Sequence, residues 1–253
     1  MLNVQRITFL YFTAIWFSFL LGFMTWMIFG ICIFIYLILM IYGSYYVNSG
    51  FYIKTIAHGN QKEKKITLTF DDGPDKIITP AILDILKKHE IKATFFPIGK
   101  SAESHPDIIK RIKEEKHIIG NHSYSHSKWF DFWSPQAMYK DFLKAHEVIF
   151  NITGENVQLF RPPYGVTNPL VQKAFNRTKY ICVGWSLRSL DSSIRNKNRL
   201  FNRIVSKVKG GDIILLHSNV NITLEILEKL INSLEDKNFE FVQLDELVDL
   251  KLL

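Results

Sequence analysis

The sequence contains no charged residue from Ile7 to Val47, and this stretch restricts the fold of the chain more than any other. As a single helix its roughly 41 residues would be about 60 Å long, twice the thickness of a hydrocarbon core of about 30 Å. The apolar region of a secretory signal peptide is shorter and ends at a cleavage site of small residues, so a signal peptide fits poorly. We therefore expect residues 1–47 to form a membrane anchor of two transmembrane helices.

The turn between these helices is expected near Gly22 to Thr25, with Gly30 as the alternative. Two spans place the N-terminus and the rest of the chain on the same side of the membrane. Arg6 precedes the stretch and several lysines follow it between Lys54 and Lys65, which by the positive-inside tendency favours the cytoplasm. A single tilted span would place the rest of the chain outside, so the sequence leaves the side open.

The remaining chain divides into a polar, basic connector over residues 48–64 and one globular domain over residues 65–253. In the domain, strand-like segments such as 66–70 and 213–216 alternate with segments whose apolar residues recur at helical spacing. Such units with short connections predict a parallel sheet, either doubly wound or closed into a barrel. The unusual polar residues follow the strands, at the edge where α/β folds place their chemistry.

The net charge of +7 comes from 31 basic and 24 acidic residues. Basic and acidic side chains alternate, as between Lys110 and Lys116, which is typical of a solvated helix face rather than of a nucleic-acid-binding stripe. We therefore expect no nucleic-acid partner. Cys32 lies in the apolar stretch and Cys182 in a predicted strand, so we do not expect them to pair, and they do not indicate a redox compartment.

Two adjacent carboxylates, Asp71 and Asp72, follow the strand that begins at Ile66, and Gly73 and Pro74 come next. Proline lacks the donor that a sheet needs and glycine favours a turn, so the strand ends here with both acids at its carboxyl end. Taken alone, such a sequence is most often an exposed acidic turn. Adjacent carboxylates repel, however, and a structure that keeps both ionised usually supplies a cation beside them. One acid is then a natural metal ligand and the other a natural base.

A second cluster contains His122 and His126. Two histidines four residues apart lie on one face of a helical turn and can bind one cation, although this spacing alone more often reflects unrelated histidines. Together with Asp72 they complete a set that leaves positions open for water and substrate. Such a set suits Zn, Fe, Co, Ni or Mn, and hydrolytic chemistry favours zinc. The sequence has no His-Glu-x-x-His motif, so a zinc protease of the usual kind is not indicated.

Three further residues have an ordinary interpretation when each is taken alone: His217 as a packed core residue, Asp191 as a loop aspartate and Arg161 as a surface cation. Considered together, the motifs resemble polysaccharide deacetylases of the NodB-homology type, carbohydrate esterase family 4. The resemblance covers residues 65–247. The motifs appear in the order of that family: Thr-Phe-Asp-Asp-Gly-Pro at 69–74, the run from His122 to His126, Arg-Pro-Pro-Tyr-Gly at 161–165 and Ile-Ile-Leu-Leu-His at 213–217.

The resemblance implies a distorted (β/α) barrel, one divalent metal ion, and hydrolysis of N-acetyl groups from N-acetylglucosamine-type sugars. It implies that Asp72, His122 and His126 bind the metal. It further implies that Asp71 is the catalytic base and that His217 is the acid that protonates the leaving amine. Zinc is the expected metal, with Co, Ni or Mn as alternatives.

The remaining roles also come from the resemblance. Arg161 would orient the base, and Asp191 would orient and charge the catalytic acid. The backbone N–H of Tyr164 would contribute to the oxyanion hole. Pro163, Tyr164 and Leu215 would contact substrate, with Leu215 facing the acetyl methyl group.

One motif departs from the family pattern. The family usually shows Asp-x-x-Asp-Trp where this chain has Arg188, Asp191 and Ser192, so the first Asp and the Trp are replaced. The missing Trp is expected to remove one wall of the acetyl pocket. This leaves the size of the substrate, and the preference between N-acetyl and O-acetyl groups, open.

The leading hypothesis is a membrane-anchored, metal-dependent deacetylase of an N-acetylated cell-envelope glycan. Two alternatives share the fold: a non-catalytic glycan-binding membrane protein, and a metal-dependent esterase or amidase for another acetylated substrate. The expected partners are the glycan and the lipid bilayer. The acceptor stays open among peptidoglycan, exopolysaccharide, lipid-linked sugar and lipopolysaccharide, and so does the oligomeric state.

Overall fold

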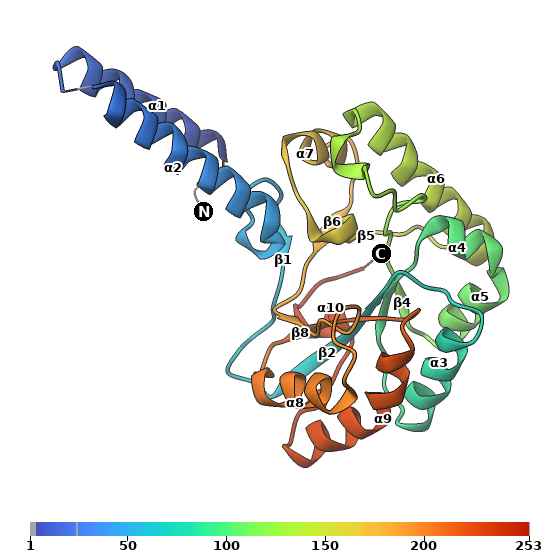
Figure 1. The fold of residues 1–253 in the computed structure, drawn as a ribbon. Coiled ribbons are helices and arrows are strands. Elements are labelled where there is room, and N and C mark those ends of the chain that lie inside the picture. The colour runs from blue at the N-terminus through green and yellow to red at the C-terminus, as the bar shows by residue number, and fades with distance from the viewer. Residues whose placement is uncertain (1–3, 24, 253) are drawn as a thin grey trace.

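The structure is a computed structural model that describes residues 4–23 and 25–252 (Figure 1). Its helices are α1 (Val4–Leu20), α2 (Trp26–Tyr45), α3 (Ile78–Lys88), α4 (Gly99–Ser104), α5 (Pro106–Glu114), α6 (Pro135–Thr153), α7 (Pro169–Phe175), α8 (Lys197–Lys207), α9 (Asn221–Asp236) and α10 (Leu244–Leu247). Its strands are β1 (Thr55–Ile56), β2 (Lys65–Asp71), β3 (Thr94–Phe96), β4 (Ile118–Ile119), β5 (Leu159–Phe160), β6 (Ile181–Val183), β7 (Leu187–Arg188), β8 (Ile213–His217) and β9 (Glu240–Phe241). Short 3-10 helices are η1 (Val47–Ser49), η2 (Phe130–Phe132) and η3 (Pro163–Gly165).

The apolar N-terminal stretch forms α1 and α2, which lie side by side and extend away from the rest of the molecule (Figure 1). The hydroxyl groups of Thr8 and Tyr36 are 3.0 Å apart, and the rings of Tyr11 and Tyr36 stack with centroids 5.3 Å apart. Among the helices of the described residues, α2 alone is both long and apolar enough to cross a membrane, since α1 is only 17 residues long. One candidate span therefore follows from the structure.

Residues 48–64, expected as a connector, are instead built into the body of the protein. Strand β1 pairs in parallel with β6, and Phe51, Tyr52 and Ile53 are buried in a core cluster. The reason is the apolar triplet itself, because burying three such side chains stabilises the fold by several kcal/mol, roughly 1.5–3 kcal/mol each. The sequence did not predict this packing because the segment as a whole is polar and basic.

All the paired strands run parallel, as the alternation of strands and helices predicts. Six strands form one sheet, in which β4, β3, β2, β8 and β7 follow in order and β9 pairs with β2; β1, β6 and β5 form a second sheet. A parallel bridge between Asn121 and Phe160 joins the end of β4 to β5, and the chain passes directly from β6 to β7. The strands thus close into a distorted barrel, with helices around the outside (Figure 1).

Strand β2 shows how the sequence places the acids. Side chains alternate along a strand, so Ile66, Leu68 and Phe70 share one face and are fully buried in the main core cluster, which also includes residues of α3 and α9. The opposite face carries Thr69 and Asp71. The apolar alternation therefore fixes the direction in which the first acid points, which is toward the interior of the barrel.

Candidate active site

The two acids leave the end of β2 in different directions. Asp71 is the last residue of the strand, whereas Asp72 has a φ of 69°, which turns its side chain out of the alternation. Gly73 follows because a Cβ atom at this position would collide with the side chain of Ser218. Because their side chains point in different directions, the two neighbouring carboxylates can serve separate functions.

The segment from His122 to His126 is a loop and not the helical turn that the spacing predicts; Ser123 and His126 have φ values of 65° and 45°. Side-chain acceptors replace the helical hydrogen bonds. The Asn121 side chain accepts from the N–H of Ser123 at 2.8 Å, and the Asp141 carboxylate on α6 accepts from the backbone N–H groups of both residues 124 and 125. The prediction of a helical turn was wrong because it ignored these distant acceptors.

The loop nevertheless brings both imidazoles to Asp72. The Nε2 atoms of His122 and His126 each lie 3.4 Å from Asp72 Oδ1. The ligand atoms of the three residues all lie within 4.8 Å of one another. The backbone carbonyl of Arg161 binds His122 Nδ1 at 2.8 Å, which leaves Nε2 of that ring available as a ligand.

The charges at this cluster suit a cation. Burial alone would raise the pKa of Asp72, but hydrogen bonding to His122 and the charges of the nearby histidines outweigh burial and lower the pKa to about 2. Burial, with the charge of His122, lowers the pKa of His126 to about 4. An ionised carboxylate and a neutral imidazole are the forms that bind a metal. Burial would lower the pKa of His122, but the charge of Asp71 and the hydrogen bond and charge of Asp72 raise it, so His122 would release a proton on binding a metal. One oxygen and two nitrogen donors fit a divalent transition metal ion.

Asp71 is held by the fully buried guanidinium of Arg161. Arg161 Nη1 donates to Asp71 Oδ1 and to the hydroxyl of Thr69, both at 2.8 Å. Its other nitrogens donate to the carbonyls of Val183 at 3.2 Å and Gly184 at 2.7 Å. Because all of these hydrogen bonds hold the Arg161 guanidinium, referred to below as the Arg161 fork, they also fix the orientation of the Asp71 carboxylate. Its second oxygen, Oδ2, lies 3.9 Å from His122 Nε2.

His217 is the last residue of β8 and lies next to Asp71 in the register of the sheet. Its Nδ1 lies 2.7 Å from Asp191 Oδ1, and its Nε2 lies 3.9 Å from Asp72 Oδ2. Asp191 Oδ2 also accepts from the backbone N–H of His217 and from the hydroxyl of Thr223. Burial would lower the pKa of His217, but the hydrogen bond and charge of Asp191 dominate and raise it to about 9. The ring is therefore protonated at neutral pH.

These groups open into a pocket of about 230 Å³. Tyr164, with a φ of 59°, stands at its rim, 43% exposed, and its hydroxyl donates to the backbone carbonyl of His126 at 3.2 Å. Pro163, the preceding residue, is buried and does not line the pocket. The lining residues are Asp71, Asp72, His122, His126, Tyr164, Gly165, Trp185, Arg188, Ser192, Leu215 and His217.

Trp185 is a wall residue that sequence reasoning missed. It lies between β6 and β7 and lines the pocket beside Leu215. Gly165, at a φ of 70°, makes room for it, because a Cβ atom there would collide with the indole ring. The glycine that ends the Arg-Pro-Pro-Tyr-Gly motif was the available signal. An indole thus lines the pocket even though Ser192 occupies the position where the family usually has Trp.

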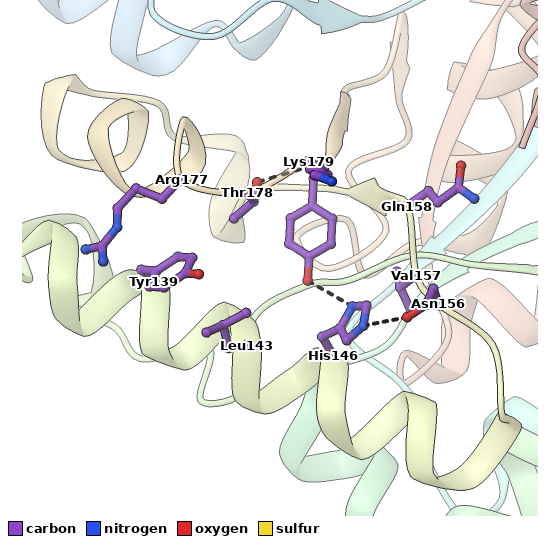
Figure 2. Close-up of a pocket in the computed structure, with 10 residues that line it drawn as sticks. Tyr139, Leu143, His146, Asn156, Val157, Gln158, Arg177, Thr178 and Lys179 are labelled. Atoms are coloured by element: carbon purple, nitrogen blue, oxygen red, sulfur yellow. Dashed lines mark hydrogen bonds between the residues drawn. The ribbon is translucent and has the colours of Figure 1, made fainter. Parts of the chain in front are cut away.

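A larger pocket of about 710 Å³ lies elsewhere, between α6 and the segment that connects α7 to β6 (Figure 2). His146 on α6 is hydrogen bonded to the Tyr180 hydroxyl and to Asn156, both at 3.2 Å, and Figure 2 marks its bond to Asn156 with a dashed line. None of the described residues that line this pocket is a carboxylate, and it shares no residue with the smaller pocket. The groups suited to hydrolysis therefore gather in the smaller one.

Comparison with known proteins identifies the family of the chain. The sequence model of the polysaccharide deacetylase family matches residues 58–183. The peptidoglycan-N-acetylmuramic acid deacetylase PdaA of Bacillus subtilis is 36% identical over 194 residues, which cover 75% of this chain and 73% of that protein. The chain belongs to the polysaccharide deacetylase family. The NodB-homology resemblance drawn from the motifs is thereby confirmed.

The solved structure of PdaA, described as a family 4 carbohydrate esterase, superposes with a TM-score of 0.70 at 34% identity, covering 76% of this chain and 84% of that one. The structure of BA3943 from Bacillus anthracis, described as a CE4 family pseudoenzyme, has a TM-score of 0.72 at 28% identity and covers 79% and 70%. The peptidoglycan-N-acetylglucosamine deacetylase PgdA of Listeria monocytogenes is 36% identical over 189 residues. The chain spans 40% of the length of that relative.

Proposed function

We propose that this polysaccharide deacetylase is a metal-dependent hydrolase that removes N-acetyl groups from N-acetylglucosamine-type residues of a cell-envelope glycan. The observation that carries the proposal is that the ligand atoms of Asp72, His122 and His126 lie within 4.8 Å of one another, with Asp71 3.9 Å from His122 and His217 3.9 Å from Asp72. The names of the relatives, deacetylases of N-acetylglucosamine or N-acetylmuramic acid in peptidoglycan, support the substrate class.

Asp72, His122 and His126 would hold the metal, and zinc is our choice because hydrolysis needs no redox chemistry, with Co, Ni or Mn as alternatives. Such an ion supplies Lewis acidity toward a carbonyl oxygen and lowers the pKa of coordinated water toward about 7. The chain's own contribution begins with orientation. The contact from the Arg161 carbonyl fixes the His122 ring with Nε2 toward the site.

Asp71 then acts as the general base that takes a proton from the attacking water. The Arg161 fork presents one oxygen of Asp71 in a fixed direction and pairs the buried carboxylate with a buried guanidinium. The backbone N–H of Tyr164 donates to the oxyanion that develops on the acetyl carbonyl, where one such donor contributes about 3–4 kcal/mol. Leu215 and Trp185, which line the pocket, shape the wall for the acetyl methyl group.

His217 acts as the general acid that protonates the leaving amine. The amide nitrogen leaves poorly without a proton, so the reaction needs a second group whose pKa differs from that of the base. Asp191 supplies this difference, because its hydrogen bond and negative charge keep the His217 ring protonated.

Acetate release tests the proposal. We expect the zinc-loaded full chain to release acetate from N-acetylglucosamine oligomers and to stop when the metal is chelated. Asp71→Asn keeps the size of the side chain but removes the base, so acetate release should fall by roughly 10²–10⁴ while bound metal, measured by elemental analysis, is unchanged. Asp107→Asn, at an exposed position on α5, is the matched control. Full activity in Asp71→Asn would contradict the assigned role.

A non-catalytic glycan-binding protein is the second candidate, since a similar solved structure is described as a pseudoenzyme and this chain carries Arg188 and Ser192 in the altered motif. Glycan binding by the metal-loaded wild type without acetate release, across N-acetyl and O-acetyl substrates, would favour it. A metal-dependent esterase would instead release acetate from O-acetylated xylan alone.

We further propose that residues 1–47 anchor the protein through two membrane spans, α1 and α2. Helix α1 would be about 26 Å long, close to the thickness of a hydrocarbon core, and it packs along α2 through Tyr11 and Tyr36. Residues 48–64 link this anchor to the catalytic unit over 65–253 while contributing β1 to it. Reporters fused at the N-terminus and after Leu252 would distinguish the topologies, because two spans place the two fusion points on the same side of the membrane and a single span by α2 places them on opposite sides.

A further inference from the structure

A second cavity adjoins the active-site pocket and leads toward the end of α2. Its volume is about 380 Å³, and Trp185 and Arg188 line both it and the active-site pocket. Tyr45 and Tyr46 at the end of α2 form its far wall. A substrate whose acetyl group lies beside Trp185 can therefore extend past Arg188 toward the helix that we propose to span the membrane.

The adjoining cavity is positively charged. Arg188 of β7 and Arg203 and Lys207 of α8 line it, and none of the described residues that line it is acidic. No ion pair within the described parts of the chain involves any of these three cations. Three cations without a carboxylate partner around one cavity constitute a site for an anion, since charge-assisted hydrogen bonds to phosphate are among the strong ones.

Hydrogen bonds from an arginine side chain to backbone carbonyls hold the walls of the cavity together. Arg203 Nε donates to the carbonyl of Ser189 at 3.0 Å, and Nη2 donates to the carbonyl of Arg188 at 3.1 Å. These bonds tie α8 to the end of β7, and the Arg188 guanidinium lies 5.7 Å from the centre of the Trp185 ring. The cation nearest the acetyl pocket therefore occupies the position where the family pattern usually has an aspartate, whose charge would repel an anion.

The far wall identifies the source of the anion. Tyr45 and Tyr46 are 62% and 50% exposed and end the apolar helix α2. Tyrosines at the end of a membrane helix lie at the level of the lipid headgroups. We propose that Arg188, Arg203 and Lys207 bind the phosphate or diphosphate through which the acetylated sugar is linked to a membrane lipid. This inference rests on the proposed deacetylase function and names its substrate class.

Three substrates test the inference with the zinc-loaded full chain in phosphatidylcholine vesicles. They are N-acetylglucosamine linked by diphosphate to a C15 polyprenol, soluble N-acetylglucosamine 1-phosphate, and the neutral trimer tri-N-acetylchitotriose. We expect kcat/KM for the lipid-linked sugar to exceed that for the neutral trimer by about tenfold or more, because each charge-assisted hydrogen bond to the anion accounts for about that factor.

Arg188→Gln and Lys207→Gln should each reduce that preference about tenfold. Lys207 is exposed on α8, so its removal should not disturb folding. Lys197→Gln, which removes an exposed lysine from the start of the same helix, should leave the preference unchanged.

An unchanged preference in both cavity variants would overturn the inference and leave the deacetylase function standing, as would a wild type that prefers the neutral trimer. Equal kcat/KM values for the soluble phosphate and the lipid-linked sugar would overturn the lipid source. Absence of acetate release from all three substrates and from longer oligomers would instead overturn the proposed function itself.

Discussion

At the scale of single residues, the buried pair of Arg161 and Asp71 links stability to activity. Arg161 is fully buried and makes hydrogen bonds to two side chains and two backbone carbonyls. We expect Arg161→Met to lower the free energy of unfolding by about 3–5 kcal/mol, because it leaves a carboxylate buried without its partner. Denaturant unfolding of the apo protein measures the change.

The control for this prediction is the exposed pair of Arg111 and Asp84. Removing an exposed ion pair changes stability by less than about 1 kcal/mol, so Asp84→Ala should differ little from the wild type. If Arg161→Met were as stable as Asp84→Ala, the Arg161 fork would not hold Asp71 in the way described here, and the proposed orientation of the base would lose its support.

At the scale of structural elements, the candidate metal site depends on how α6 supports the loop before it. The Asp141 carboxylate accepts hydrogen bonds from the backbone N–H groups of Tyr124 and Ser125, which lie between the two proposed histidine ligands. We expect Asp141→Ala to weaken zinc binding by about 10- to 100-fold, the usual effect of losing a group that orients metal ligands. Calorimetric titration with zinc measures the affinity.

Saturating zinc should restore most of the activity of Asp141→Ala, since the ligands themselves are intact. Asp141→Asn keeps one acceptor oxygen, so its zinc affinity should lie between that of the wild type and that of Asp141→Ala. Glu147→Ala, at an exposed position on the same helix, is the control. Wild-type zinc affinity in Asp141→Ala would mean that the loop keeps its shape without α6.

The element scale also explains what could be predicted from the sequence. Asp72, His122 and His126 were recognisable because each follows a strand, and parallel strands bring their carboxyl ends to one edge. The loop shape was not predictable, because its acceptor Asp141 lies far along the chain. Trp185 was missed for the same reason, since its place in the pocket depends on the gap at Gly165.

At the scale of the whole molecule, buried His117 makes stability depend on pH. Its Nδ1 accepts from the backbone N–H of Ala93 at 3.1 Å; Glu115 Oε2 lies 3.7 Å from its Nε2, and the charge of Lys92 acts on it from nearby. Burial, followed by the charge of Lys92, lowers the pKa of His117 from 6.5 to about 4. Between these values the unfolded chain binds the proton and the folded protein does not.

The free energy of unfolding should therefore decrease as the pH falls from about 6.5 to about 4, with His117 responsible for at most about 3 kcal/mol. His117→Asn keeps an acceptor for Ala93 and cannot be protonated, so its stability should depend less on pH in this range. Denaturant unfolding at several pH values measures the difference. His58→Asn, at an exposed histidine, should keep the wild-type dependence.

The place of β1 determines where the catalytic unit can begin. The sequence suggests a domain that starts at residue 65, but β1 pairs with the edge of β6. Gly184 connects this pairing to the active site, because its N–H donates to the Ile56 carbonyl at 2.8 Å and its own carbonyl accepts from Arg161. We expect a chain that begins at Ser44 to fold, and one that begins at Lys65 to aggregate. The shorter chain loses the buried Phe51–Ile53 triplet and exposes an unpaired strand edge beside the site.

Solubility and thermal unfolding of the two chains provide the measurement, and a chain that begins at Ser44 with Ile53→Asp separates the effect of the triplet from that of length. That substitution places a charge in a core where Ile53 is 3% exposed, so it should reproduce the failure of the shorter chain. Cooperative folding with full zinc binding by the chain from Lys65 would show that β1 belongs to the anchor. In that case the contact of Gly184 with Ile56 would not be needed to hold Arg161, and the active site would be independent of the segment that joins it to the membrane helices.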